Sequence, residues 1–144
     1  MSFFSKTLAI DQARVVAAIG AAELKTSGEI RVLLARGRTE DAMATAKAHF
    51  ERLGMTATKE RNGVLIFLAS KSRAFAVIGD TGVHEKCGEV FWRLLAAEME
   101  LHFKRAEFTE GLVHGIEKAG ALLAEHFPRG ADDRNELPDE IEEA

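Results

Sequence analysis

Two short, mainly apolar runs, residues 63–69 and 74–79, form the most informative pattern in this chain. The first run is almost wholly apolar and follows an Asn62-Gly63 turn pair, which is typical of a strand covered on both faces. The second run ends at Gly79-Asp80-Thr81-Gly82, where two glycines free the backbone and Asp80 offers a carboxylate. We therefore expect a β-hairpin that delivers a carboxylate to a loop, without a complete catalytic motif beside it.

The remaining periodicity predicts helices around these strands. Along the chain we expect a helix capped by Asp11, a strand at 29–35, a helix at 42–53 with Thr39 as its N-cap, strands at 63–69 and 75–78, a helical turn at 83–87, and helices at 89–103 and 107–127. This order predicts the α/β class, as a three-layer α/β/α sandwich with a small mixed sheet of three to four strands.

Chain direction brings three distant polar residues to one edge of the expected sheet. The strand–helix–strand order makes the first two strands parallel, and the short turn at Lys71 makes the third antiparallel. Glu29, Asn62 and Asp80 then share one rim, and Glu85 follows on the next segment. Oxygen ligands beside glycines suit a hard cation such as calcium or magnesium. The residues leave a second interpretation open, in which Glu29 is a solvated strand end and Asp80 caps the following helix.

The opposite rim carries basic and hydroxyl side chains, among them Arg36, Arg38, Thr39, Ser70 and Lys71. Ligands of open α/β sheets bind at the carboxyl ends of parallel strands, and a helix N-terminus there favours anions. A phosphate at Arg38 and Thr39 is therefore one interpretation, and a basic solvated turn is the other.

Charge divides the chain into a near-neutral body and an acidic tail. The net charge is −4, and residues 129–144 hold seven acids and two arginines, so the tail carries −5 and the body +1. We divide the chain into an α/β domain at 1–128 and an acidic C-terminal tail at 129–144. The tail is expected to be mobile at its end, or else to dock through Leu137 and Ile141, its large apolar residues. A near-neutral body argues against nucleic-acid binding.

No apolar run approaches the roughly 20 residues that span a bilayer, and residues 1–6 turn polar too soon for a signal peptide. We therefore expect a soluble, cytoplasmic protein.

Cys87 and Arg93 have the spacing of cysteine phosphatases, but the intervening segment contains Phe91 and Trp92 and resembles a helix, so we interpret Cys87 as a partly buried thiol. His84 is the histidine nearest the rim that carries Glu29, Asn62 and Asp80.

Four ordered motifs resemble the TPM domain family, which includes thylakoid-lumen acid phosphatase-like proteins. They are Thr26-Ser27-Gly28-Glu29-Ile30-Arg31-Val32, Asn62-Gly63-Val64-Leu65-Ile66, Gly79-Asp80-Thr81-Gly82 and Glu110-Gly111-Leu112-Val113-x-Gly115-Ile116. The resemblance runs from about Thr7 to Phe127, and the tail is similar to that of a small cytosolic bacterial subgroup. It implies an α/β/α sandwich, a calcium or other divalent-cation site at the acidic loops, and phosphatase activity in some relatives. By position, Glu29 and Asp80 correspond to the family's strand-start acid and post-strand loop.

These observations support three hypotheses. The first is a non-enzymatic module that binds a divalent cation, or a protein partner, through Glu29, Asp80 and Glu85, with Asn62 and His84 on the same rim. The second is a metal-assisted phosphatase acting on phosphomonoesters, with Asp80 as a principal ligand and His84 as acid or base. The third is a partner-binding protein without a metal, using the acidic tail.

Overall fold

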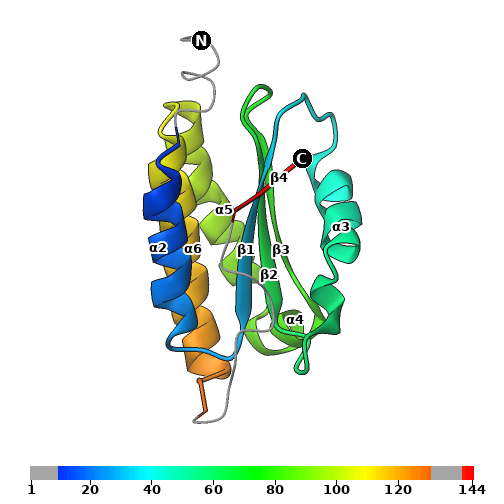
Figure 1. Ribbon diagram of the computed structural model, residues 1–144, viewed down its shortest axis with the longest axis vertical. Helices are drawn as coiled ribbons and strands as arrows, with labels where there is room; N and C mark the ends of the chain where they lie inside the picture. Colours follow the sequence, from blue (N-terminus) through cyan, green and yellow to red (C-terminus); the bar gives the residue numbers. More distant parts are fainter. Residues whose placement is uncertain (1–9, 131–140) are drawn as a thin grey trace.

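A four-stranded mixed sheet forms the middle layer of the computed structural model, which describes residues 10–130 and 141–144 (Figure 1). The strands lie in the order β3-β2-β1-β4. They are β1 (Glu29–Ala35), β2 (Gly63–Ala69), β3 (Ala74–Gly79) and β4 (Ile141–Glu143). Strand β1 is parallel to both β2 and β4, whereas β3 is antiparallel to β2. The expected parallel pair and the expected hairpin are therefore confirmed.

Helices cover both faces of the sheet. They are α2 (Gln12–Glu23), α3 (Ala42–Arg52), the 3-10 turn η1 (Met55–Ala57), α4 (Thr81–Cys87), α5 (Glu89–Lys104) and α6 (Phe108–His126). Figure 1 shows α2, α5 and α6 on one side of the strands and α3 on the other. The predicted three-layer α/β/α architecture is confirmed. No helix in the described part of the chain has both the length and the apolar character needed to cross a membrane.

The strands separate two hydrophobic clusters because successive side chains point to opposite faces. On β1, Ile30, Val32 and Leu34 pack in the cluster beneath α2, α5 and α6, whereas Leu33 packs in the cluster beneath α3. Every residue of β2 is buried, since both faces of that central strand are covered. Fully burying one such aliphatic side chain contributes about 1.5–3 kcal/mol. The apolar run at 63–69 thus contributes side chains to both hydrophobic clusters of the core.

Aspartates begin three of the helices. Asp11 accepts a hydrogen bond from Arg14 N at 3.1 Å, as expected for the N-cap of α2. The N-cap of α3 is Asp41, whose carboxylate accepts from Ala44 N at 3.0 Å, so the expected cap at Thr39 is wrong. The N–H of Thr39 donates instead to Ser72 Oγ at 3.1 Å, which ties the residue to the hairpin turn.

The end of the chain joins the sheet. Ile141 is aligned with Val32 of β1, and its half-buried side chain packs against the cluster beneath α2, α5 and α6. Docking through Ile141 is therefore confirmed, and the expectation of a mobile chain end is wrong for residues 141–143. Leu137, the other residue expected to dock, lies outside the described residues.

Candidate functional site

The strand register assembles the rim that the sequence predicts. Glu29 is aligned with Gly63, and Val64 is aligned with Gly79, so the starts of β1 and β2 and the end of β3 meet. The N–H of Asp80 donates to Gly63 O at 2.9 Å, and the N–H of Glu29 donates to Asn62 O at 3.4 Å. We call this edge the acidic rim, formed by Ser27, Glu29, Glu60, Arg61, Asn62 and Asp80.

The carboxylate of Asp80 is almost fully enclosed, with 5% of the side chain exposed. It accepts two hydrogen bonds from the guanidinium of Arg61, from Nε at 2.7 Å and from Nη2 at 2.8 Å. Its Oδ1 also accepts from Thr81 N at 2.7 Å, which caps α4. The interpretation of Asp80 as a helix cap is therefore confirmed. Both oxygens of the proposed ligand are engaged by a cationic side chain that the sequence reasoning missed.

Arg61 occupies a tight turn that is bound to α4 at two points. Its backbone lies in the left-handed region at φ 52°, which is unfavourable for a residue with a side chain. Arg61 N donates to Thr58 O at 3.2 Å, and Arg61 O accepts from Gly82 N at 2.9 Å. Any Cβ on Gly82 would lie 2.3 Å from Glu60 O, so only glycine permits this approach. The Gly-Asp-Thr-Gly corner thus holds the turn in place.

A second chain of polar contacts runs along the rim. Ser27 Oγ donates to Glu60 Oε2 at 2.7 Å and accepts from Asn62 Nδ2 at 3.2 Å. The N–H of Asn62 donates to Thr58 Oγ1 at 3.2 Å. Sequence reasoning placed Asn62 on the rim but missed Ser27, Glu60 and Arg61. The available signal was position, because residues 59–62 lead directly into β2 and must lie at its starting edge.

Glu29 and Glu85 have opposite environments. Glu29 begins β1 with 1% of its surface exposed, so its interpretation as a solvated strand end is wrong. Glu85 lies on the exposed surface of α4. Within residues 10–130 and 141–144, no set of three or more histidine, cysteine, aspartate or glutamate side chains is grouped so that it could hold a metal ion. The ligand role of Glu29, Asp80 and Glu85 stays a prediction.

A pocket of about 360 Å³ opens beside Asp80, between α3, η1 and α4. It is lined by Lys47, Phe50, Glu51, Thr56, Ile78, Gly79, Asp80, Thr81 and His84. His84 is exposed on α4, and its ring lies 6.5 Å from the ring of Trp92. The pocket therefore places a histidine, a lysine and the buried aspartate around one space, which is large enough for a small ion or a phosphoryl group.

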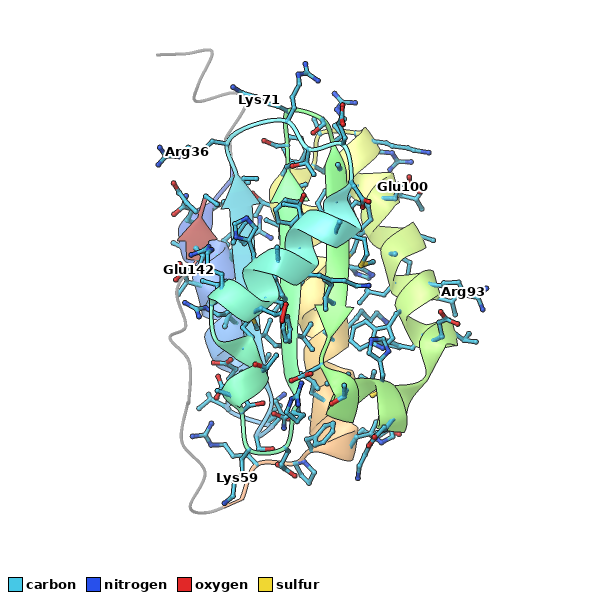
Figure 2. The ribbon with its side chains drawn as sticks, turned by 90° about the vertical axis from the view of Figure 1, so that its right-hand side faces the viewer. Arg36, Lys59, Lys71, Arg93, Glu100 and Glu142 are labelled. Carbon is cyan, nitrogen blue, oxygen red and sulfur yellow. The ribbon has the colours of Figure 1, made fainter. Side chains whose placement is uncertain are left out.

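The basic rim lies at the other end of the sheet, where Figure 2 labels Arg36 and Lys71, far from Lys59. Arg36 Nη2 is paired with Glu143 Oε1 at 2.9 Å. The first turn of α3 is capped by the carboxylate of Asp41, so a negative charge already occupies the helix N-terminus considered for phosphate. This arrangement favours the interpretation of a basic solvated turn.

Cys87 does not lie in a phosphate-binding loop. It ends α4, and α5 begins at Glu89, so the residues between Cys87 and Arg93 are mainly helical. Burial, and secondarily the charge of Glu125, raise the pKa of the Cys87 thiol. A nucleophilic cysteine needs a lowered pKa. The interpretation of Cys87 as a partly buried thiol is confirmed.

Comparison with known proteins agrees with this fold. The family profile described as the TPM domain matches residues 2–122. The NMR structure of the BA42 protein from the psychrophilic bacterium Bizionia argentinensis is similar, with a TM-score of 0.85 and 41% sequence identity. The alignment covers 92% of this chain and 92% of that protein. No functionally curated protein matches this chain.

Proposed function

This chain belongs to the TPM domain family, and we propose that it is a non-enzymatic binding module whose acidic rim takes up a divalent cation. The ion, calcium or magnesium, would take the place of the Arg61 guanidinium on Asp80. The observation that carries the proposal is the bidentate ion pair between these two side chains, with N–O distances of 2.7 and 2.8 Å.

A carboxylate as enclosed as that of Asp80 needs a positive partner, because an isolated charge is costly to remove from water. The resident partner can be exchanged. The side chain of Arg61 is 46% exposed, and its long stem lets the guanidinium swing into solvent. A cation that replaces it would leave Asp80 compensated. In this proposal Arg61 competes with the cation for Asp80 and so sets the affinity of the acidic rim for the cation.

The donor chemistry around Asp80 fits a hard cation. Calcium binds six to eight oxygen atoms from carboxylates, amides, backbone carbonyls and water. The rim supplies carboxylates from Glu29 and Glu60, the hydroxyl of Ser27 and the amide oxygen of Asn62. Among the described residues these groups do not form a finished metal site. The proposal therefore requires the cation to displace Arg61 from Asp80 and to draw the other oxygen ligands toward it. Glu85 would contribute from the exposed surface of α4.

Thermal unfolding with and without cation tests the proposal. A ligand present at 100 times its dissociation constant stabilises the folded state by about 2.7 kcal/mol. We expect millimolar calcium or magnesium to raise the Tm of the wild-type chain. Arg61→Gln should lower the Tm in the absence of cation and show a larger rise with cation, because the competitor is gone.

Three carboxylate-to-amide variants complete the experiment. Asp80→Asn should abolish the cation-dependent rise, whereas Glu100→Gln makes the same change of charge on the exposed surface of α5 and should keep it (Figure 2). Glu85→Gln tests its ligand role and should reduce the rise. If adding cation leaves the Tm of the wild type and the Tm of Arg61→Gln both unchanged, cation binding is refuted. The Asp80–Arg61 pair would then be a structural contact only.

A metal-assisted phosphomonoesterase is the second candidate. The pocket beside Asp80 favours it, because Lys47 and His84 line the same space as the carboxylate. In this hypothesis His84 acts as acid or base and Lys47 attracts the phosphate. Hydrolysis of p-nitrophenyl phosphate by the wild-type chain, lost in both Asp80→Asn and His84→Asn, would support an enzyme. Equal turnover by wild type and Asp80→Asn would indicate a contaminant.

A further inference from the structure

Strand β4 is a short segment held on the edge of β1 by backbone hydrogen bonds, by the packing of Ile141 and by two ion pairs. Its register aligns Val32 with Ile141, Leu33 with Glu142 and Leu34 with Glu143. Two flanking backbone hydrogen bonds extend the pairing, from Arg36 N to Ala144 O at 2.9 Å and from Ala144 N to Leu34 O at 3.0 Å. Figure 1 shows β4 as a short strand separated in sequence from the rest of the fold.

The receiving edge is built for acidic residues. Arg31 projects from β1 with 7% of its side chain exposed, and its Nη2 is paired with Glu142 Oε2 at 2.5 Å. At the end of the strand, Glu143 accepts from Arg36 Nη2 at 2.9 Å and from Gln12 Nε2 at 3.2 Å. Figure 2 shows Glu142 and Arg36 along this edge. A buried guanidinium inside a strand requires a carboxylate beside it.

Glu142 satisfies only part of the hydrogen-bonding capacity of the Arg31 guanidinium. Nε of Arg31 is buried, and no described residue supplies a hydrogen-bond partner for it. A guanidinium and a carboxylate can form two parallel hydrogen bonds, and Glu142 makes one with Nη2. An incoming carboxylate that engages both Nε and Nη2 would therefore bind this edge better than β4 does.

The other half of the edge is closed. The N–H of Ile30 donates to Glu23 Oε2 at 2.8 Å, and Glu23 is 2% exposed. An incoming strand therefore cannot pair along the whole of β1. It has to align with residues 32–36, which fixes its register against Arg31 and Arg36.

We propose that the edge of β1 at residues 32–36 is a strand-accepting site for a partner protein. The partner would displace β4 with an extended segment that has one apolar residue followed by two acidic residues. The apolar residue would take the place of Ile141, and the two acids would pair with Arg31 and Arg36. Backbone hydrogen bonds would supply affinity and the two arginines selectivity, as in other cases of β-strand addition. Strand β4 acts as an internal competitor that keeps the site filled in the absence of the partner.

A peptide with the sequence of residues 137–144, labelled at its N-terminus, is a suitable probe. The receptor is the full chain with Glu142→Arg and Glu143→Arg, which should release β4 by repulsion from Arg31 and Arg36. Fluorescence anisotropy should show at least tenfold tighter binding of the peptide to this variant than to the wild-type chain. The wild type resists because its own strand competes at an effective concentration in the millimolar range.

Controls on both sides of the contact decide the outcome. A peptide with glutamine in place of both acids should bind at least tenfold more weakly. Adding Arg31→Met to the receptor should remove binding, whereas adding Arg38→Gln should not change it. Circular dichroism checks that the receptor is folded, and the milder Glu142→Gln receptor replaces it otherwise.

Three results would overturn the proposal. They are equal peptide binding by wild type and released variant, equal binding of the acidic and the glutamine peptide, and binding that survives Arg31→Met. Sedimentation velocity examines the remaining occupant, a second copy of this chain. We expect the wild type to be a monomer. A wild-type dimer that is lost in the Glu142→Arg, Glu143→Arg variant would assign the edge to strand exchange between copies and overturn the partner assignment.

Discussion

Asp80 joins two functions in one carboxylate, because it caps α4 through Thr81 N and clamps the guanidinium of Arg61. The helix and the turn before β2 are therefore fixed to each other through a single side chain. Substitutions at this residue can separate the two contributions.

Asp80→Asn and Asp80→Ala should both destabilise the fold, to different extents. Asparagine keeps the capping oxygen but loses the charge that binds Arg61, whereas alanine loses both. We expect the alanine variant to be less stable than the asparagine variant by about 1 kcal/mol, the typical contribution of an N-cap. Urea unfolding of the wild type and of the two variants measures this difference in the free energy of unfolding. Equal stabilities of the two variants would show that the cap contributes nothing here.

Gly82→Ala should disrupt the acidic rim. The added Cβ would lie 2.3 Å from Glu60 O and 2.7 Å from Arg61 O, so α4 and the turn must move apart. We expect a loss of about 2–3 kcal/mol, typical of overpacking against a rigid backbone. Gly37→Ala is the matched control, because no described atom lies within 4 Å of its Cβ position, and it should stay within about 0.5 kcal/mol of wild type. Chemical denaturation compares the two.

The helical layer should depend on Phe103 far more than on its neighbour Leu101. Phe103 is 1% exposed in the core, whereas Leu101, on the same helix, is 59% exposed. Phe103→Ala should cost about 3–5 kcal/mol through the cavity it leaves. Leu101→Ala should change the free energy of unfolding by less than about 0.5 kcal/mol. Similar losses in both variants would mean that the Leu101 surface is covered in solution.

Docking of β4 should be visible in the titration of Glu143. Hydrogen bonds from Arg36 and then from Gln12 hold the pKa of Glu143 below the usual value of a glutamate. A lowered carboxyl pKa contributes stability that is present above the unfolded-state value of about 4.3 and is lost as the pH falls through the folded-state value. Arg36→Gln should raise this pKa toward the ordinary value, and Arg38→Gln should leave it unchanged. NMR titration of the Glu143 carboxyl carbon measures both, and an unshifted titration in Arg36→Gln would contradict the pairing.

The sequence predicted what depends on periodicity and chain direction. The run at 63–69 is β2 with the predicted bounds, and Glu29, Asn62 and Asp80 meet because strand order forces them together. Arg61 was missed because a guanidinium on a long stem can reach many partners, and no spacing rule selects Asp80. The sequence suggested docking of the tail through Leu137 and Ile141 as one alternative but did not predict strand β4, because three residues with two acids have no periodicity and the buried Arg31 beside Glu142 is visible only in the fold.

The contact between Glu23 and the Ile30 amide has a consequence for the behaviour of the protein at high concentration. Unpaired strand edges are where chains stack into fibrils, and a carboxylate that occupies one edge amide removes that amide from such pairing. On this side of the sheet, a neighbouring chain can therefore pair with residues 32–36 at most, so one acidic side chain shortens the edge that chain-to-chain stacking could use even when the C-terminal segment is detached.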